Sequence, residues 1–226
     1  RMFSHLIGYD DRGKAGLELQ GNFYMLRSHI NIFERTYNQL KEEKNRGDNL
    51  ITRVDYKLQE AAYNALGSCD GAVVVMEPDT GRILAMVSKP DYDLNNMDDV
   101  WAYIDSEEGA NSSMLLNRAT QGMYAPGSTF KLVTMLEYIR EHPNDYGNYT
   151  YNCVGSAIFS GVSIHCSHDN VHGNVTLADS LAYSCNLSFA NIGTTLDLAG
   201  YRSTADKLLF NSELPYDGVY NKSQFV

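Results

Sequence analysis

The feature that most constrains this chain is the stretch Tyr-Ala-Pro-Gly-Ser-Thr-Phe-Lys at residues 124–131. Its Pro-Gly pair interrupts regular structure, and the residues that follow have the apolar spacing of a helix. Ser128 is therefore expected at or near a helix N-terminus, with Lys131 one turn further on. Because residues three apart share a helical face, the lysine amine is expected to reach the serine hydroxyl. The apolar stripe of this helix is predicted to consist of Leu132, Met135, Leu136 and Ile139.

A serine and a lysine in this arrangement can carry out nucleophilic catalysis. A serine hydroxyl needs a base before it attacks an acyl group, and a partly desolvated lysine can lose its charge and act as that base. The positive end of a helix also favours the negative charge that develops. The motif alone leaves a second interpretation open, in which Ser128 only caps the helix.

Length and charge bound the class of protein. The 226 residues indicate one large domain, or one domain with an appendage. The formal net charge of −10 argues against a nucleic-acid partner, whose phosphates need a basic surface. No apolar run approaches the roughly 20 residues that span a bilayer, and no secretory signal opens the chain. Because Arg1 is not a natural-looking start, we expect the chain to be cut from a longer protein.

The predicted elements indicate an α+β fold. Residues 52–66 have a helical stripe that Gly67 ends, with Asp55 as a possible cap. Residues 71–76 and 82–88 are apolar runs on either side of a Glu-Pro-Asp-Thr-Gly turn, which predicts a hairpin in an antiparallel sheet.

The last third of the chain is expected to be helical. Thr176 and Asp179 form a capping-box pattern that begins one helix. A second helix is predicted from about residue 187 to 198, where Gly200 ends it, and a third over residues 204–210.

The cysteines of the chain are Cys69, Cys153, Cys166 and Cys185. Cys153 and Cys166 flank a segment with Gly and Ser that fits a hairpin, so a disulfide between them is one interpretation for a protein outside the cytoplasm. A second interpretation groups these two with His165, His168 and His172 as metal ligands. That spacing fits no regular zinc pattern, so we expect surface loop residues and no metal site.

Several stretches together resemble the transpeptidase domain of class B penicillin-binding proteins, the enzymes that cross-link peptidoglycan. Ser-x-x-Lys is part of the signature of penicillin-binding proteins and class A β-lactamases. The stretches that carry the resemblance are residues 52–59, 71–88, 117–119, 124–131, 172–173 and 184–186. Their order and spacing match the family from about residue 50 onward. The opening segment is similar to the end of the family's non-catalytic pedestal domain.

The resemblance implies a fold and a division of the chain. The expected fold is an antiparallel sheet packed with helices, as in penicillin-binding proteins and serine β-lactamases, here only in part. Residues 1–48 are expected to be the end of the pedestal or its linker, and residues 49–226 the N-terminal part of the transpeptidase domain.

The resemblance also implies roles for particular residues. Ser128 would attack the carbonyl of a D-Ala-D-Ala stem peptide and become an acyl-enzyme, while Lys131 takes its proton. Ser184 would relay a proton to the leaving group, and Asn186 would hydrogen-bond Lys131 and the substrate amide. The backbone N–H of Ser128 would supply half of an oxyanion hole. Between the last two residues, Cys185 is interpreted as packing, because no His/Asp arrangement is evident to activate it.

The family further implies a cellular setting. Expected partners are peptidoglycan stem peptides, β-lactam antibiotics and a glycosyltransferase of the divisome or elongasome. The expected location is the extracytoplasmic face of the bacterial cell membrane, with an N-terminal anchoring helix that this chain lacks. No cofactor or metal is expected, since the serine mechanism needs none.

One family motif is absent from this sequence. After Lys131, Lys207 precedes Leu and Lys222 precedes Ser-Gln, so no Lys-Thr-Gly or Lys-Ser-Gly occurs. In the family that motif supplies carboxylate recognition and the second oxyanion donor. We therefore expect an incomplete transpeptidase domain with weak or no activity alone. The alternatives kept open are a D,D-carboxypeptidase or β-lactamase, and a β-lactam-sensing or non-catalytic scaffold protein of cell-wall synthesis.

Overall fold

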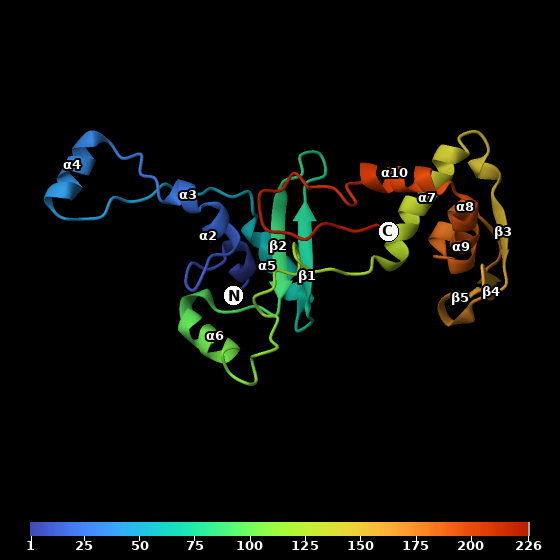
Figure 1. Cartoon of the computed structure of the whole chain (residues 1–226), viewed down its shortest axis with the longest axis horizontal. Coiled ribbons are helices and arrows are strands. Elements are labelled where there is room, and N and C mark those ends of the chain that lie inside the picture. Colours follow the sequence, from blue (N-terminus) through green and yellow to red (C-terminus); the bar gives the residue numbers. More distant parts are fainter. Residues whose placement is uncertain (226) are drawn as a thin grey trace. The chain divides into compact units, whose positions relative to one another are not determined.

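The computed structural model describes residues 1–225, which form two compact units. The first unit comprises Arg1–Met123 and Pro215–Asn221, and the second comprises Tyr124–Leu214 and the residues from Lys222 onward. Both units contain helices and antiparallel strand pairs (Figure 1), as an α+β fold requires. Among the described helices, none combines the length and the apolar character needed to cross a membrane.

The first unit holds short helices and one hairpin. Its elements are α1 (Ser4–Ile7), α2 (Gly16–Gln20), α3 (Asn22–Met25), α4 (Ile32–Leu40), α5 (Tyr56–Leu66), β1 (Gly71–Met76), β2 (Ile83–Lys89), the 3-10 turn η1 (Leu94–Asn96) and α6 (Met97–Ile104).

The hairpin forms as the sequence predicts. β1 pairs with β2 in antiparallel register, with Gly71 opposite Lys89. Helix α5 packs against the hairpin (Figure 1), and the buried cluster between them includes Ala62 of the helix and Val87 of the strand. This apolar contact holds the helix on the sheet.

A buried polar side chain of helix α5 also hydrogen-bonds to strand β2. The side-chain amide of Gln59 is fully buried and exchanges two hydrogen bonds of 2.8 Å with the backbone N–H and C=O of Met86. Asp55 accepts a 3.0 Å hydrogen bond from the N–H of Leu58 and so caps the helix, and Gly67 ends it with φ of 55°. The predicted start and stop signals of this helix are therefore confirmed.

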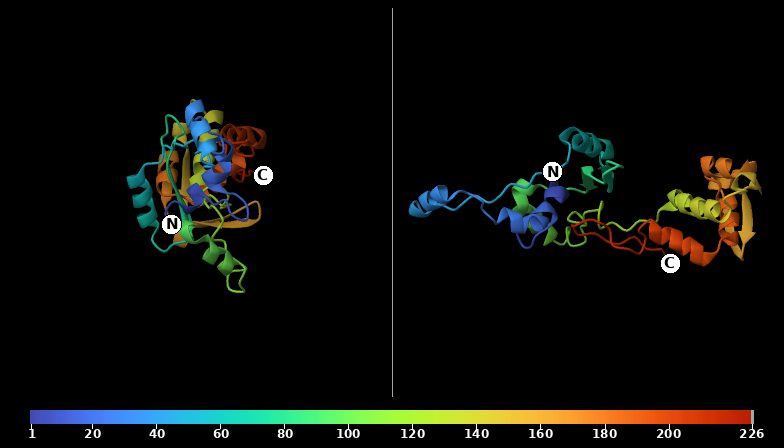
Figure 2. Two further views of the ribbon diagram at one scale, coloured as in Figure 1. Left: turned by 90° about the vertical axis from the view of Figure 1, so that its left-hand side faces the viewer. Right: turned by 90° about the horizontal axis from the view of Figure 1, so that it is seen from above.

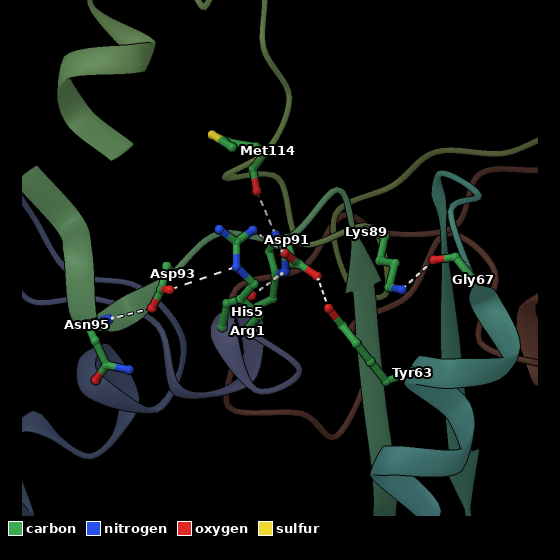
Figure 3. Close-up of polar contacts among 10 residues, drawn as sticks. Arg1, His5, Tyr63, Gly67, Lys89, Asp91, Asp93, Asn95 and Met114 are labelled. Atoms are coloured by element: carbon green, nitrogen blue, oxygen red, sulfur yellow. Dashed lines mark hydrogen bonds and ion pairs between the residues drawn. The ribbon is translucent and has the colours of Figure 1, made fainter. Parts of the chain in front are cut away.

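A polar network around Asp91 ties the N-terminal segment into the first unit (Figure 3). The carboxylate accepts a 2.6 Å hydrogen bond from the hydroxyl of Tyr63 and pairs with Arg1 at 3.3 Å. The bond to Asp91 raises the pKa of Tyr63, because a phenolate would lose that hydrogen bond and face a second negative charge. His5 of α1 reaches the backbone carbonyl of Met114 at 2.8 Å. These contacts fasten the start of the chain to the segment that follows β2.

The second unit carries the Ser-x-x-Lys motif. Its elements are the 3-10 turn η2 (Gly127–Phe130), α7 (Lys131–Glu141), η3 (Tyr146–Asn148), β3 (Thr150–Cys153), β4 (Ser156–Phe159), β5 (Val162–His165), η4 (Ser167–Asp169), β6 (Gly173–Thr176), α8 (Leu177–Ala182), α9 (Asn186–Thr195) and α10 (Leu198–Lys207).

Helix α7 is the central element of this unit. It contacts α9 and α10, and α10 runs beside it (Figures 1 and 2). The strands pair antiparallel as β3 with β6 and as the hairpin β4–β5. The capping box at Thr176 and Asp179 begins α8 as predicted. An apolar cluster of Leu177, Phe189, Ile192 and Leu196 forms a core against which α7 packs.

The predicted apolar stripe of α7 is wrong in part. Leu132 and Leu136 are about half exposed, whereas Val133, Thr134 and Glu137 are buried. The reason is a polar contact: the carboxylate of Glu137 is satisfied by Arg140 and by the hydroxyl of Thr204 on α10 at 2.6 Å. A buried face that contains a paired acid does not follow the apolar periodicity.

The predicted end of the second helix also differs. Helix α9 ends at Thr195, and Gly200 lies inside α10 rather than at a helix end. Asp197 accounts for the difference, because its side chain accepts a 2.8 Å hydrogen bond from the N–H of Gly200 and starts a new helix.

Candidate active site

The Ser128 side chain stands at the turn that leads into α7. Gly127 has φ of 58°, a left-handed conformation that glycine adopts without strain. Ser128 then lies within η2, and α7 begins directly at Lys131. The expectation of a serine near a helix N-terminus with a lysine one turn on is met by this geometry.

A second turn, between α8 and α9, carries Ser184 and Asn186. Ser184 has φ of 52°, an uncommon conformation for a residue other than glycine. Cys185 is the N-cap of α9, where its sulfur accepts a hydrogen bond from the N–H of Ser188, and Asn186 is the first residue of the helix. The strained turn directs the side chain of Ser184 toward α7, where it contacts Lys131.

The two turns meet around the amine of Lys131. Its Nζ lies 2.6 Å from the carbonyl oxygen of Ser184, 2.6 Å from Oδ1 of Asn186 and 2.9 Å from Oγ of Ser184. Oγ of Ser128 lies 3.3 Å from the same amine and 2.9 Å from Oγ of Ser184. The structure therefore brings together all four residues that the sequence singled out.

The contacts of Lys131 are suited to a neutral amine. Two of its partners, the Ser184 carbonyl and the Asn186 oxygen, can only accept hydrogen bonds. A neutral amine that donates to both has its lone pair left for the hydroxyl protons of Ser128 and Ser184. Burial lowers the pKa of Lys131, while the nearby Cys185 and Cys166 sulfurs act in the opposite direction. The lysine is thus placed to take a proton from a serine hydroxyl.

The orientation of the Asn186 amide is set from both sides. Its oxygen faces Lys131, and its Nδ2 donates a 2.7 Å hydrogen bond to the backbone carbonyl of His165 at the end of β5. The second hydrogen on Nδ2 is available for another acceptor. The sequence gives no signal for the part played by His165, because any residue offers a backbone carbonyl.

The structure corrects the sequence interpretation of the cysteines and histidines. Cys153 and Cys166 are buried rather than on a surface loop, and they are not disulfide-bonded. Cys185 and His172 join them, whereas His165 and His168 do not belong to the cluster. These four side chains are the ones in the described part of the chain that could hold a metal ion.

The sequence matches the penicillin-binding protein transpeptidase domain over residues 71–224. This match covers more than half of the chain, so the chain belongs to that family. The class B resemblance is thereby confirmed, since the similar curated proteins are named peptidoglycan D,D-transpeptidases.

Two of these relatives illustrate the extent of the match. PbpA of Mycolicibacterium smegmatis is 34% identical over 165 residues, which cover 66% of this chain and 33% of that protein. MrdA of Escherichia coli strain K12 is 38% identical over 130 residues, which cover 54% of this chain and 20% of that protein. The chain thus spans about a third or less of the length of these curated relatives.

Solved structures agree on the fold. The D,D-transpeptidase domain of a peptidoglycan glycosyltransferase from Eggerthella lenta has a TM-score of 0.83 and is 26% identical, covering 98% of this chain and 49% of that chain. Penicillin-binding protein A from M. tuberculosis, solved as an imipenem acyl-enzyme complex, has a TM-score of 0.83 at 23% identity, and the match covers 99% of this chain and 55% of that chain. The predicted fold class is confirmed by these likenesses.

Proposed function

We propose that this chain carries the nucleophile and base of a serine D,D-transpeptidase that cross-links peptidoglycan stem peptides. The observation that supports this proposal most is the position of the Lys131 amine among Ser128, Ser184 and Asn186, within 3.3 Å of an oxygen atom of each. If Ser128 only capped the helix, Lys131 would not need three such partners from two separate turns.

The first step is acylation of Ser128. Lys131 takes the hydroxyl proton as Oγ attacks the carbonyl carbon between the two D-alanines. The oxyanion that forms accepts a hydrogen bond from the backbone N–H of Ser128, which lies in the first turn of η2, where N–H groups have no partner within the helix. A donor of this kind contributes about 3–4 kcal/mol to transition-state stabilisation.

Ser184 is proposed as the proton relay. Its Oγ lies 2.9 Å from both Lys131 Nζ and Ser128 Oγ, so a proton can pass from the lysine through this hydroxyl to the departing D-alanine amine. The amine of a second stem peptide then attacks the acyl-enzyme, and its proton returns along the same route. The C–N bond lost in the first step is replaced by the cross-link formed in the second.

Asn186 is proposed to hold both the base and the substrate. Its oxygen fixes the Lys131 amine, and the remaining hydrogen on Nδ2 is free to bind a carbonyl of the stem peptide. β-Lactams are proposed to enter by the same route and acylate Ser128, because they imitate the D-Ala-D-Ala terminus.

The wider setting is also a proposal. We place residues 1–48 at the end of a pedestal and residues 49–226 in the transpeptidase domain. We expect a glycosyltransferase partner in the divisome or elongasome and a location on the extracytoplasmic face of the membrane. The alternative functions for the same site are those of a D,D-carboxypeptidase, a β-lactamase, and a β-lactam-sensing or non-catalytic scaffold protein of cell-wall synthesis.

The experiment that separates these functions offers the purified protein, at its natural length, a stem peptide ending in D-Ala-D-Ala. Released D-alanine and the cross-linked dimer are measured with and without a second stem peptide that carries a free amine. A transpeptidase gives dimer, whereas a carboxypeptidase gives D-alanine alone. Rapid turnover of a penicillin would identify a β-lactamase. The wild type is expected to form product and Ser128→Ala to form none. A wild type that, like Ser128→Ala, forms neither product would contradict the proposal.

A further inference from the structure

A buried cluster of sulfur and nitrogen atoms lies beside the candidate active site, in the same unit. We call Cys153, Cys166, His172 and Cys185 the thiol–imidazole cluster. Cys153 ends β3, Cys166 follows β5, His172 precedes β6 and Cys185 caps α9, so the four come from separate segments of the chain. The three cysteines are at most 3% exposed, and one ligand atom from each of the four residues lies within 4.8 Å of the others.

The spacing of these atoms fits a tetrahedral metal. A zinc ion bound to sulfur at about 2.3 Å and to nitrogen at about 2.0–2.1 Å holds S–S pairs about 3.8 Å apart and S–N pairs about 3.6 Å apart. Here the Sγ atoms of Cys153 and Cys166 are 3.6 Å apart, and those of Cys166 and Cys185 are 3.8 Å apart. Nδ1 of His172 lies 3.4 Å from Sγ of Cys153. Three of the six edges of the cluster therefore have the lengths expected of an S₃N tetrahedron, and all of its ligand atoms lie within 4.8 Å of one another.

The cluster is poorly explained as a disulfide or as ordinary core. A disulfide needs an S–S distance of about 2.05 Å, and three mutually close cysteines cannot all pair. Apolar packing would not require an imidazole nitrogen to face the sulfurs. Three thiolates and one imidazole in tetrahedral arrangement are typical of structural zinc, and four protein ligands leave no open position for water or substrate.

We propose that the thiol–imidazole cluster binds one zinc ion and that this ion positions Ser184 and Asn186. The metal site itself is independent of the proposed function, whereas the positioning role rests on it. The ion would not touch the substrate, so its ligands are positioning residues and not catalytic ones.

The connection to the site runs through neighbouring residues. Cys185 lies directly between Ser184 and Asn186, and Cys166 directly follows His165, whose carbonyl accepts the hydrogen bond from Asn186. A metal that joins Cys166 to Cys185 therefore fixes both partners of that bond. The bond sets the direction of the Asn186 amide, and the amide in turn holds the Lys131 amine. Loss of a group that hydrogen-bonds to the ligands of a metal typically lowers metal affinity or activity by about 10–100-fold.

The ligand set also has a supporting shell. The ring of His172 stacks on Tyr183 with centroids 5.7 Å apart and an angle of 10° between the planes. Such contacts orient ligands and are expected around a metal that is held permanently.

The first test measures metal in the protein purified at its natural length without added metal salts. Elemental analysis is expected to give about one zinc per chain, and replacement by Co²⁺ is expected to give the absorption spectrum of a tetrahedral thiolate site. Cys153→Ser is expected to lose the metal, while Cys69→Ser, which changes an exposed cysteine outside the cluster, is expected to keep it. Absence of zinc from the wild type, or iron or copper in its place, would overturn the assignment.

The second test separates positioning from folding. The hydrogen bonds of Cys153 go to Cys166, Asn170 and His172 and to none of the four site residues, so an effect of this position on the site must be transmitted through the cluster. Cys153→Ser is therefore expected to slow penicillin acylation by about 10–100-fold and to shift the pH profile of acylation. Both effects are compared with the urea unfolding of the same variant. Removal of zinc by a chelator is expected to act in the same way. Unchanged acylation and an unchanged pH profile in metal-free protein would overturn the positioning role.

A final control keeps the two proposals apart. Ser128→Ala is expected to abolish acylation while it retains zinc in full. Zinc in a protein that never acylates would refute the proposed function and leave the metal site standing.

Discussion

The Nζ atom of Lys131 lies 2.6 Å from Oδ1 of Asn186, although the two residues are 55 positions apart in the chain. This contact joins the start of α7 to the start of α9, the two helices that carry the site. It also determines how the lysine can act. An amine that donates to the Asn186 oxygen and to the Ser184 carbonyl can, when neutral, direct its lone pair toward the serine hydroxyls.

Replacement of this lysine tests the identity of the base. Lys131→Arg keeps a positive charge but cannot lose its proton, so acylation by a penicillin is expected to fall by about 10²–10⁴-fold. The rate is measured by stopped-flow or quenched mixing with a fluorescent penicillin. Lys207→Arg, an exposed position at the end of α10, is the matched control and is expected to acylate normally. Acylation by Lys131→Arg near the wild-type rate would exclude Lys131 as the base.

The pH dependence of acylation follows from the lowered pKa of Lys131. Burial disfavours the charged amine, so the neutral base is present at a lower pH than for a free lysine side chain. The acylation rate is expected to rise with pH through a midpoint below 10.5, the ordinary value. Asn186→Asp would place a carboxylate against the amine and is expected to move the midpoint upward. If the midpoint does not move in Asn186→Asp protein that circular dichroism shows to be folded, the midpoint does not report the Lys131 amine.

The backbone of Ser184 allows its two roles to be separated. Ser184→Ala and Ser184→Gly both remove the hydroxyl relay, and each is expected to lose about 10²–10⁴-fold in acylation rate. Glycine, however, adopts the left-handed φ of 52° without strain, whereas alanine does not. Urea unfolding is therefore expected to show the glycine variant to be at least as stable as the alanine variant. The reverse order would mean that the turn is not strained as described.

The residues that form the site differ in how far the sequence could reveal them. Ser128 and Lys131 are three apart on one turn, so their contact follows from helical geometry alone. Ser184 and Asn186 lie on a different helix, and only the family resemblance indicated that they would meet the lysine. For the thiol–imidazole cluster, the sequence offered Cys153, Cys166 and His172 only as part of an irregular metal-ligand set. It missed Cys185, because tertiary structure brings the four segments of the cluster together.

Among the helices, too, some features follow from local sequence signals and others depend on tertiary contacts. The stop at Gly67 and the capping box at Thr176 are local signals, and both are confirmed. The buried face of α7 depends instead on Glu137, whose burial is possible only because Arg140 and Thr204 hydrogen-bond its carboxylate. Periodicity assigns such an acid to the solvent side, since burial of an unpaired carboxylate is costly.

Glu137 also gives a prediction for stability. The hydrogen bonds from Arg140 and Thr204 lower the pKa of Glu137 to about 2, below the 4.5 of a free glutamate. The contribution of the Glu137 carboxylate to the free energy of unfolding is therefore full above pH 4.5 and is lost as the pH falls through the folded-state pKa. Glu137→Gln is expected to lower the free energy of unfolding by about 2 kcal/mol at pH 7 and to reduce the loss of stability in acid.

Urea unfolding at pH 7 and in mild acid measures both effects of the Glu137 variant. Asp206→Asn changes an exposed acid on α10 and serves as the control, with little effect expected at either pH. An equal acid sensitivity in Glu137→Gln and wild type would contradict the importance of this buried pair.

The most direct test of the central claim is the mass of the intact protein after incubation with a penicillin. The wild type is expected to gain the mass of one penicillin, and peptide mapping is expected to place it on Ser128. Ser128→Ala, and wild type pre-incubated with an unlabelled β-lactam, are expected to show no new adduct. An adduct that persists in Ser128→Ala, or a natural-length wild type that never acquires one, would contradict the assignment of Ser128 as the nucleophile.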